Sequence, residues 1–251
     1  MSIPQTFPEL TKNLLLLEQF QFEDECFNSA CTTLEVLVNK FHDWIVCGHN
    51  ISAFETARSF RRYLSSLSGF YTVTQPEWEC FTLCGTLINR AGSCLGLTTL
   101  HLALGETVGL PMRVALFEGH TTPVYMDGEI PIFIETTRHS SVMYEYSIRQ
   151  LHGQPIKILS HEEFLAVHLS NRASFVYARV GLMDDAIFLI DSALEIFPDY
   201  TAGWINRAVI MKKLENNKEL QRSLDMAKSL NPGVRYTRAI ERIENNELIT
   251  T

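Results

Sequence analysis

Three residue types that together can perform covalent catalysis occur in chain order within one stretch of the sequence. They are the thiol of Cys94, the imidazole of His120 and the carboxylate of Glu135. In such a set the thiolate attacks a carbonyl carbon, the imidazole takes and returns the proton, and the carboxylate orients the ring. The stretch therefore suggests acyl-transfer chemistry, provided that the fold brings the three side chains together.

Cys94 precedes an apolar run with helical spacing that extends to Val108, and Gly109 and Pro111 supply the stop signals. We expect Cys94 near the N-terminus of this helix, where the partial positive charge of the backbone favours a thiolate. The backbone N–H of Cys94 is then a candidate oxyanion donor. The upstream side chains of Asn89 and Gln75 are two further candidates.

The dipeptide Asp127-Gly128 lies between two alternating runs, which is a strong β-hairpin signal. A turn centred on it places His120 directly opposite Glu135 on the same face, with Cβ atoms about 4.5–5.5 Å apart. Glu135 can then accept one ring N–H while the other ring nitrogen takes the thiol proton. His101, along the predicted helix, and Glu118, before the hairpin, are the weaker rivals for these roles.

Four short motifs carry a resemblance to a known family. The chain resembles the transglutaminase-like core family, in its bacterial subgroup that often carries tetratricopeptide repeats; the motifs are Gly-Ser-Cys-Leu-Gly-Leu at 92–97, Gly-Leu-Pro at 109–111, Glu-Gly-His at 118–120 and Ile-Glu-Thr-Thr at 134–137. The resemblance covers roughly residues 22–139. It implies a papain-like thiol fold in which a helix presents Cys94 to an antiparallel sheet bearing His120 and the acid. Glu135 stands where many members of the wider superfamily have Asp.

The composition is that of an ordinary soluble globular protein, with 251 residues, 46% of them hydrophobic and 20% charged. A formal net charge of −8 argues against non-specific binding of nucleic acid. The apolar runs are too short or too interrupted for a signal peptide or a membrane span. We therefore expect a cytoplasmic protein.

The six cysteines form no Cys-x-x-Cys pair, and in a reducing compartment we expect free thiols. Cys80 and Cys84 could share a helix face, but no matching ligand pair lies nearby, so neither a metal site nor a cofactor is expected.

Helical spacing in the N-terminal part predicts helices over residues 10–17 and 22–42, one capped by Asn50 or Ser52 that continues to Leu64, and a short one from Pro76. Arg58, Arg61 and Arg62 form a basic face on the third helix, either solvated or in contact with an acidic partner. Residues 69–76 are expected to be a loop or a short strand. In the connector at 140–158, Tyr144, Tyr146 and Ile148 alternate like a strand.

The C-terminal part contains a repeat with a period of 34 residues, as in the pairs Pro198 and Pro232, and Ala193 and Ala227. This period is typical of tetratricopeptide repeats. We expect two units, flanked by helices at 161–169 and 237–248, with Ala186, Ala193, Ala208 and Ala227 buried between helices. Leu220 stands where the first unit has Ala186, which implies looser packing. Because two units leave their ends uncovered, the flanking helices or the thiol domain must cover them.

The predicted fold class is α+β. Residues 1–159 are expected to form a papain-like, transglutaminase-like domain with N-terminal helices, and residues 160–251 an all-α region with two tetratricopeptide-like repeats and flanking helices. The leading functional hypothesis is a cysteine-dependent amide or ester hydrolase or transamidase using Cys94, His120 and Glu135. The alternative is a non-catalytic scaffold whose repeats dock a protein or peptide partner. A metal or redox site is disfavoured by the cysteine spacing.

Overall fold

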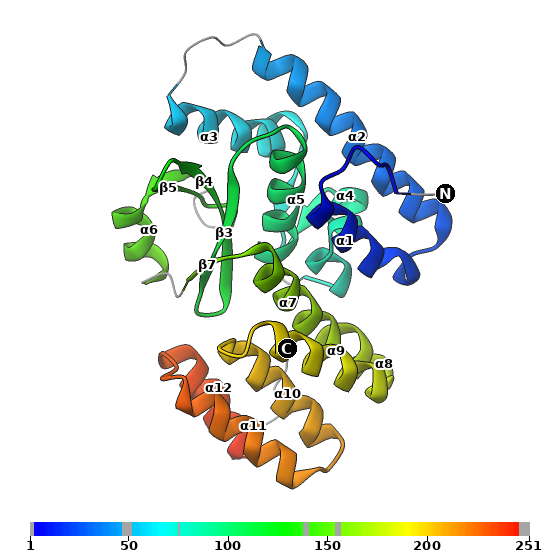
Figure 1. The fold of residues 1–251 in the computed structure, drawn as a ribbon, viewed down its shortest axis with the longest axis vertical. Coiled ribbons are helices and arrows are strands. Elements are labelled where there is room, and N and C mark those ends of the chain that lie inside the picture. The colour runs from blue at the N-terminus through cyan, green and yellow to red at the C-terminus, as the bar shows by residue number, and fades with distance from the viewer. Residues whose placement is uncertain (1–2, 47–51, 75, 138–140, 154–156, 246–251) are drawn as a thin grey trace. The chain divides into compact units, whose positions relative to one another are not determined.

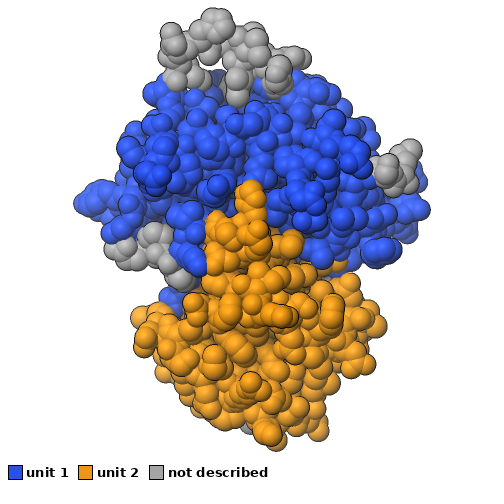
Figure 2. Space-filling view, viewed as in Figure 1, with its two compact units in different colours: residues 1–158 blue, residues 159–251 orange. Residues whose placement is uncertain are grey.

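The computed structural model describes residues 3–46, 52–74, 76–137, 141–153 and 157–245. The chain combines helices with a five-stranded sheet, in agreement with the expected mixed class (Figure 1). It divides into two compact units, residues 1–158 and 159–251, coloured separately in Figure 2. Residue 159, which the sequence analysis assigns to the first domain, belongs to the second unit.

Four helices form the N-terminal part of the first unit: α1 (Glu9–Glu18), α2 (Asp24–Val46), α3 (Ala53–Arg62) and α4 (Leu83–Asn89). The Ser52 side chain caps α3 by accepting from the Glu55 N–H at 3.2 Å, whereas Asn50 lies outside the described residues. Pro76 does not begin a helix; a 3-10 turn at Trp78–Phe81 precedes α4 instead. The buried carboxylate of Glu18 accepts from the backbone N–H groups of Leu83 and Cys84 at 2.8 and 2.7 Å, which fixes the start of α4.

The five-stranded sheet has the order β6-β5-β4-β3-β7. Its strands are β3 (Met112–Phe117), β4 (His120–Asp127), β5 (Ile130–Ile134), β6 (Val142–Tyr144) and β7 (Lys157–Leu159). The pairs β3/β4, β4/β5 and β5/β6 are antiparallel. Of the two alternatives for residues 69–76, a loop or a short strand, the structure has a short strand: β1 (Tyr71–Thr72) pairs in parallel with β2 (Ala91–Gly92), just before the cysteine.

The two faces of the sheet are covered by different helices. The helix α5 (Cys94–Thr107) contacts β3 and β4. The two elements pack so closely that a Cβ added to Gly105 of α5 would lie 2.4 Å from the Met112 side chain of β3. Residues of the alternate face, Phe117 and Phe133 among them, pack in a buried cluster with Ile148 of α6 (Glu145–His152). His120 is the sheet partner of Phe117, so its side chain lies on the face that α6 covers, and there it contacts Cys94 at the start of α5.

The expected strand through Tyr144, Tyr146 and Ile148 is wrong beyond its first residue. β6 ends at Tyr144, and α6 begins at Glu145. Helical spacing explains the difference, because Ile148 and His152 are four residues apart and both are largely buried. The ion pair of Glu145 with Arg149, also four residues apart, further stabilises the helix.

The hairpin between β4 and β5 is present, but its turn is displaced by one residue. Asp127 pairs with Ile130 and Val124 with Phe133, so the two-residue turn is Gly128-Glu129. Gly128 has φ +59° at the first central position, which matches a type II′ turn. Every partner on β5 is consequently two residues further along than expected. Because a shift of two residues conserves the side-chain face, His120 and Glu135 still share a face.

After β7, the described residues of the second unit form helices joined by short turns, without a further strand. Its elements are α7 (His161–Arg172), a π-helical turn at Ala173–Tyr177, α8 (Ala178–Val180), α9 (Met183–Ile196), α10 (Thr201–Lys213), α11 (Asn217–Ser229) and α12 (Val234–Glu244). The four alanines predicted to lie between helices are 0% exposed, so that prediction is confirmed. Leu220 is partly buried and packs against both apolar clusters of the unit. The predicted tail helix begins earlier, at Val234.

None of the helices in the described part of the chain is both long and apolar enough to cross a membrane.

Candidate active site

The loop before α5 is built to place Cys94 at the first helical position. Ser93 is the N-cap residue: its side chain accepts from the Gly96 N–H at 3.3 Å, and its own N–H donates to the Cys80 carbonyl at 2.8 Å. A Cβ on Gly96 would lie 2.1 Å from the same carbonyl oxygen, so this position needs glycine. The predicted placement of Cys94 at a helix N-terminus is confirmed, and Cys94 as a whole residue is partly exposed.

His120 and Glu135 are hydrogen-bonded neighbours, as the sequence analysis predicts. His120 Nε2 lies 3.3 Å from Glu135 Oε2, and the Glu135 side chain is fully buried. The two residues are not directly opposite each other, however. Extending the observed register would place Thr137 opposite His120, so Glu135 is a diagonal neighbour on the same face. With Nε2 on the carboxylate, Nδ1 is the ring nitrogen left for Cys94, with which His120 also hydrogen-bonds.

Glu135 has two further partners that the sequence analysis did not identify. Its Oε1 accepts from the backbone N–H and the hydroxyl of Thr137, each at 2.6 Å. Its Oε2 also accepts from His152 Nε2 at 2.5 Å, and the His152 ring stacks on His120 with centroids 4.1 Å apart. His152 is the last residue of α6, whose first half the alternation of Tyr144, Tyr146 and Ile148 predicts as a strand. The helical spacing from Ile148 to His152 is the signal that would have placed it on the buried side.

The charges of these groups support one another. Burial by itself raises the pKa of the Cys94 thiol, but the hydrogen bond and charge of His120 and the backbone of Thr121 and Leu95 outweigh it, so this pKa is lower than 9.0. Burial likewise disfavours a charged His120, yet Cys94 and Glu135 raise the pKa of His120 to about 9. Burial alone would raise the pKa of Glu135, but the hydrogen bonds from His120, His152 and Thr137 outweigh it and hold this pKa far below its usual range. At neutral pH this arrangement favours a thiolate–imidazolium pair beside an ionised carboxylate.

The candidates for oxyanion stabilisation differ in position. The backbone N–H of Cys94 lies at the helix start, where its donor is not needed by the helix. Asn89 is exposed at the end of α4, and no hydrogen bond between described residues joins it to Cys94. Gln75 lies outside the described residues. Of the rival groups, His101 is buried on α5 with Nδ1 2.7 Å from the Leu97 carbonyl, and Glu118 lies in the turn between β3 and β4.

His120, Glu135 and His152 also offer three ligand atoms within 4.8 Å of one another, which is a set that zinc can use. A tetrahedral zinc ion with bonds of about 2.0–2.2 Å would hold its ligand atoms roughly 3.3 Å apart. His152 Nε2 lies only 2.5 Å from Glu135 Oε2, and the two rings are nearly parallel, at 21°. These distances favour a hydrogen-bonded network.

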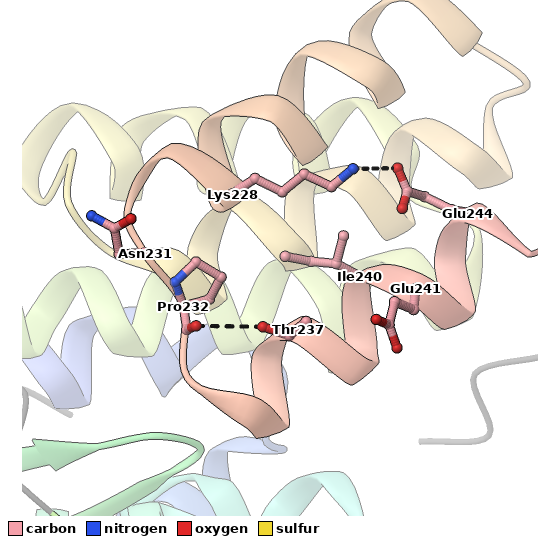
Figure 3. Close-up of a pocket in the computed structure, with 7 residues that line it drawn as sticks. All are labelled: Lys228, Asn231, Pro232, Thr237, Ile240, Glu241 and Glu244. Atoms are coloured by element: carbon pink, nitrogen blue, oxygen red, sulfur yellow. Dashed lines mark hydrogen bonds and ion pairs between the residues drawn. The ribbon is translucent and has the colours of Figure 1, made fainter.

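A hollow in the second unit offers a contrast. It is lined by residues of α11, α12 and the loop between them, and Figure 3 shows its side chains. Lys228 Nζ lies 2.5 Å from Glu244 Oε1, and the Thr237 hydroxyl donates to backbone carbonyls. These three side chains therefore already have partners within the protein. The hollow contains no cysteine or histidine. Nucleophile, base and acid thus occur together around Glu135 and not in this hollow.

Comparison with known proteins gives one fold-level similarity. No family model matches the sequence, and no curated protein matches it. Among solved structures the chain is similar to menin, in a crystal structure described as revealing the binding site for Mixed Lineage Leukemia (MLL) protein. The TM-score is 0.51 at 12% sequence identity, and the match covers 91% of this chain and 67% of the menin chain. At this identity the similarity concerns the fold alone.

Proposed function

We propose that this protein is a cysteine-dependent acyl-transfer enzyme that acts on an amide or ester carbonyl, as a hydrolase or a transamidase. The observation that carries the proposal is the continuous set of contacts from Cys94 through His120 to the buried Glu135. Nucleophile, base and orienting acid stand in the order that covalent catalysis requires.

In this mechanism the Cys94 thiolate attacks the carbonyl carbon and forms a tetrahedral intermediate. The backbone N–H of Cys94 stabilises the oxyanion, since it points from a helix start. The His120 imidazolium gives its Nδ1 proton to the leaving amine or alcohol, and a thioester on Cys94 remains. His120 then takes a proton from water or an incoming amine, which attacks the thioester and frees the thiol. Glu135 holds Nε2–H throughout, and His152 and Thr137 are positioning residues that fix Glu135.

The same proposal covers the finer fold assignment. The first unit would be a papain-like, transglutaminase-like domain, and its support is the cysteine-bearing helix against an antiparallel sheet that carries His120. The second unit would be of tetratricopeptide type, because α9 and α11 begin 34 residues apart at Met183 and Asn217 and buried alanines separate the helices. A cytoplasmic location remains part of the proposal.

Limiting alkylation tests the proposal. Brief treatment with iodoacetamide at pH 7, followed by peptide mass spectrometry, should label Cys94 at least tenfold faster than Cys26. Cys26 is the matched control because its thiol belongs to an exposed residue, the only exposed cysteine in the described part of the chain, whereas burial raises the pKa of Cys31 to about 11. Equal labelling of Cys94 and Cys26 would contradict a catalytic thiol. A p-nitrophenyl ester should be hydrolysed by the natural chain and not by Cys94→Ala.

A second experiment tests the alternative that His120, Glu135 and His152 form a zinc site. If His120, Glu135 and His152 form a hydrogen-bonded network, a chelator should leave the alkylation rate of Cys94 unchanged. Stoichiometric tight zinc binding that is lost in His152→Ala would instead assign a metal site and remove His120 as a free base.

A second candidate function is a non-catalytic protein-binding scaffold, in which the second unit docks a protein or peptide. The observation that favours it is the fold similarity to menin, whose structure is described as revealing a binding site for another protein. The alkylation test separates the two candidates, because a scaffold gives no reason for Cys94 to react faster than Cys26.

A further inference from the structure

A cavity of about 430 Å³ lies in the first unit, and of the residues placed in the candidate active site only Thr137, which donates to Glu135, lines it. Its walls come from the end of α3, the π-helical turn at Tyr63–Leu67, β1, the second and third turns of α5 and the segment after β5. Neither Cys94, His120 nor Glu135 lines it. The volume is in the range of small-molecule sites.

Three polar side chains that line this cavity have buried atoms without a hydrogen-bond partner. They are Arg61 Nε, His101 Nε2 and Thr136 Oγ1. His101 is 3% exposed and Thr136 8%. Buried polar atoms in proteins nearly always have a hydrogen-bond partner, because burial without one is unfavourable. Three of them around one cavity therefore leave hydrogen-bonding capacity that a bound molecule could use.

The chemistry of the three groups is complementary. Arg61 forms no ion pair with any carboxylate among the described residues, so its guanidinium brings an uncompensated positive charge. In His101 the Nδ1–H donates to the Leu97 carbonyl, which leaves Nε2 as a hydrogen-bond acceptor. Burial, opposed by that hydrogen bond and assisted by Arg61, lowers the pKa of His101 to about 4, so this ring stays neutral at pH 7. The Thr136 hydroxyl can donate or accept.

The segment that carries Thr136 is held in place independently of any ligand. The Thr72 hydroxyl of β1 donates to the Thr136 carbonyl at 2.6 Å. Apolar side chains, including Leu64, Phe70 and Leu97, form the rest of the wall. The cavity thus combines one cation, one fixed acceptor and one hydroxyl on apolar walls.

We propose that this cavity binds a small carboxylate that carries an N–H donor next to the carboxyl group, as an N-acylated amino acid or the C-terminal residue of a peptide does. The carboxylate pairs with the Arg61 guanidinium and accepts from Thr136, while the N–H donates to His101 Nε2. The site explains the role of one arginine of the basic face on α3, which otherwise faces solvent. It does not depend on the acyl-transfer chemistry.

Titration of the full-length chain tests the site. The probe is N-acetylglycine, and the controls are N-acetylglycinamide, which lacks the negative charge, and propionate, which lacks the N–H. Calorimetry should give saturable binding of N-acetylglycine that is at least tenfold tighter than that of the amide and about threefold tighter than that of propionate. N-acetyltriglycine, with a free C-terminus, distinguishes the sources: tighter binding than N-acetylglycine assigns a peptide terminus, and weaker binding a free small acid.

The variants assign the binding to this cavity. Arg61→Gln should weaken N-acetylglycine binding at least tenfold. Arg62→Gln should change it less than twofold, because it removes the same charge from the exposed neighbour on the same helix. Thr136→Val, which keeps the shape, should weaken binding about threefold and serves if Arg61→Gln fails to fold by circular dichroism. Absence of saturable binding, equal binding of acid and amide, or equal effects of Arg61→Gln and Arg62→Gln would each overturn the proposal.

Discussion

A charged side chain with several hydrogen-bond partners occurs in each unit, Glu135 in the first and Arg207 in the second. The two groups differ in the chemistry that their partners allow. In the first unit the buried Glu135 is bound by His120, His152 and Thr137. In the second unit Arg207 of α10 reaches Asp191 of α9 at 2.7 Å, and Glu219 and Ser223 of α11 at 3.0 and 2.9 Å.

The comparison separates a structural network from a chemical one. Arg207 and its partners include no thiol and no imidazole, so their contacts only join three helices. Around Glu135, by contrast, the partners include two imidazoles, one of which touches a thiol. A proton can therefore move within that group. Multiple hydrogen bonds to one charge do not by themselves make an active site; a titratable neighbour beside a nucleophile does.

The largest expected effect lies in the packing of the second unit. Ala193→Arg should lower the free energy of unfolding by about 3–5 kcal/mol, because Ala193 is fully buried between helices and the new side chain brings both volume and an unpaired charge. Thermal melting followed by circular dichroism measures this. Glu195→Arg, on the exposed side of the same helix, is the matched control and should change the free energy by less than about 0.5 kcal/mol. Similar melting of the two variants would mean that these helices do not pack closely.

The next effect concerns the thiol in the first unit. In the natural chain the alkylation rate of Cys94 should rise with pH through a midpoint below 9.0, since His120 lowers the pKa of the thiol. In His120→Ala only burial and the backbone remain, so the midpoint should move upward and the rate at pH 7 should fall about tenfold or more. The rate for Cys26 in the same sample is the internal control. An unchanged midpoint would show that His120 does not act on the thiol.

The pH dependence of turnover follows from the same pair. Hydrolysis of an ester should increase as Cys94 ionises below pH 9 and should decrease above about pH 9, as His120 loses the proton that it must give to the leaving group. A rate that keeps rising beyond pH 10 would argue against His120 as the acid.

Much of the candidate site can be predicted from sequence because its parts are locally determined. The helix start at Cys94 follows from the apolar spacing after it, and the shared face of His120 and Glu135 follows from strand alternation. The exact turn could not be placed, since Asp127-Gly128 and Gly128-Glu129 both contain the glycine that a tight turn needs. The face was nevertheless predicted correctly, because the register differs by an even number of residues.

The parts that sequence analysis missed depend on contacts between distant elements. His152 reaches Glu135 only because α6 folds back on the sheet, and three alternating residues before it imitate a strand. The buried Glu18 caps α4 from a helix 65 residues earlier in the chain. The cavity near Arg61 likewise combines residues of four separate segments, and nothing local to Arg61 distinguishes it from Arg58 or Arg62.

A smaller effect is expected from the structural network. Arg207→Met should lower the free energy of unfolding by about 1–2 kcal/mol, because Asp191 and Glu219 are partly exposed and their charges remain solvated. It should leave the alkylation rate of Cys94 unchanged. Arg222→Met is the matched control, since Arg222 is 70% exposed and lies 3.8 Å from the same Glu219. A change in Cys94 reactivity in Arg207→Met would contradict the division into a structural and a chemical network.

The smallest effect should come from Thr137, which tests how far the chemical network extends. Thr137→Val removes the hydroxyl that donates to Glu135 Oε1 at 2.6 Å, but the backbone N–H at the same oxygen remains. With one donor fewer, Glu135 holds His120 less firmly and stabilises its charge less, so the alkylation rate of Cys94 at pH 7 should fall about threefold, a loss of about 0.7 kcal/mol. The midpoint of the pH profile should move upward at the same time, which a purely structural role for Thr137 would not produce. Thr107→Val, at the far end of α5, removes a comparable hydroxyl bond to the Ala103 carbonyl and should leave both rate and midpoint unchanged. If the two threonine variants behave alike, the network that matters to the thiol ends at Glu135.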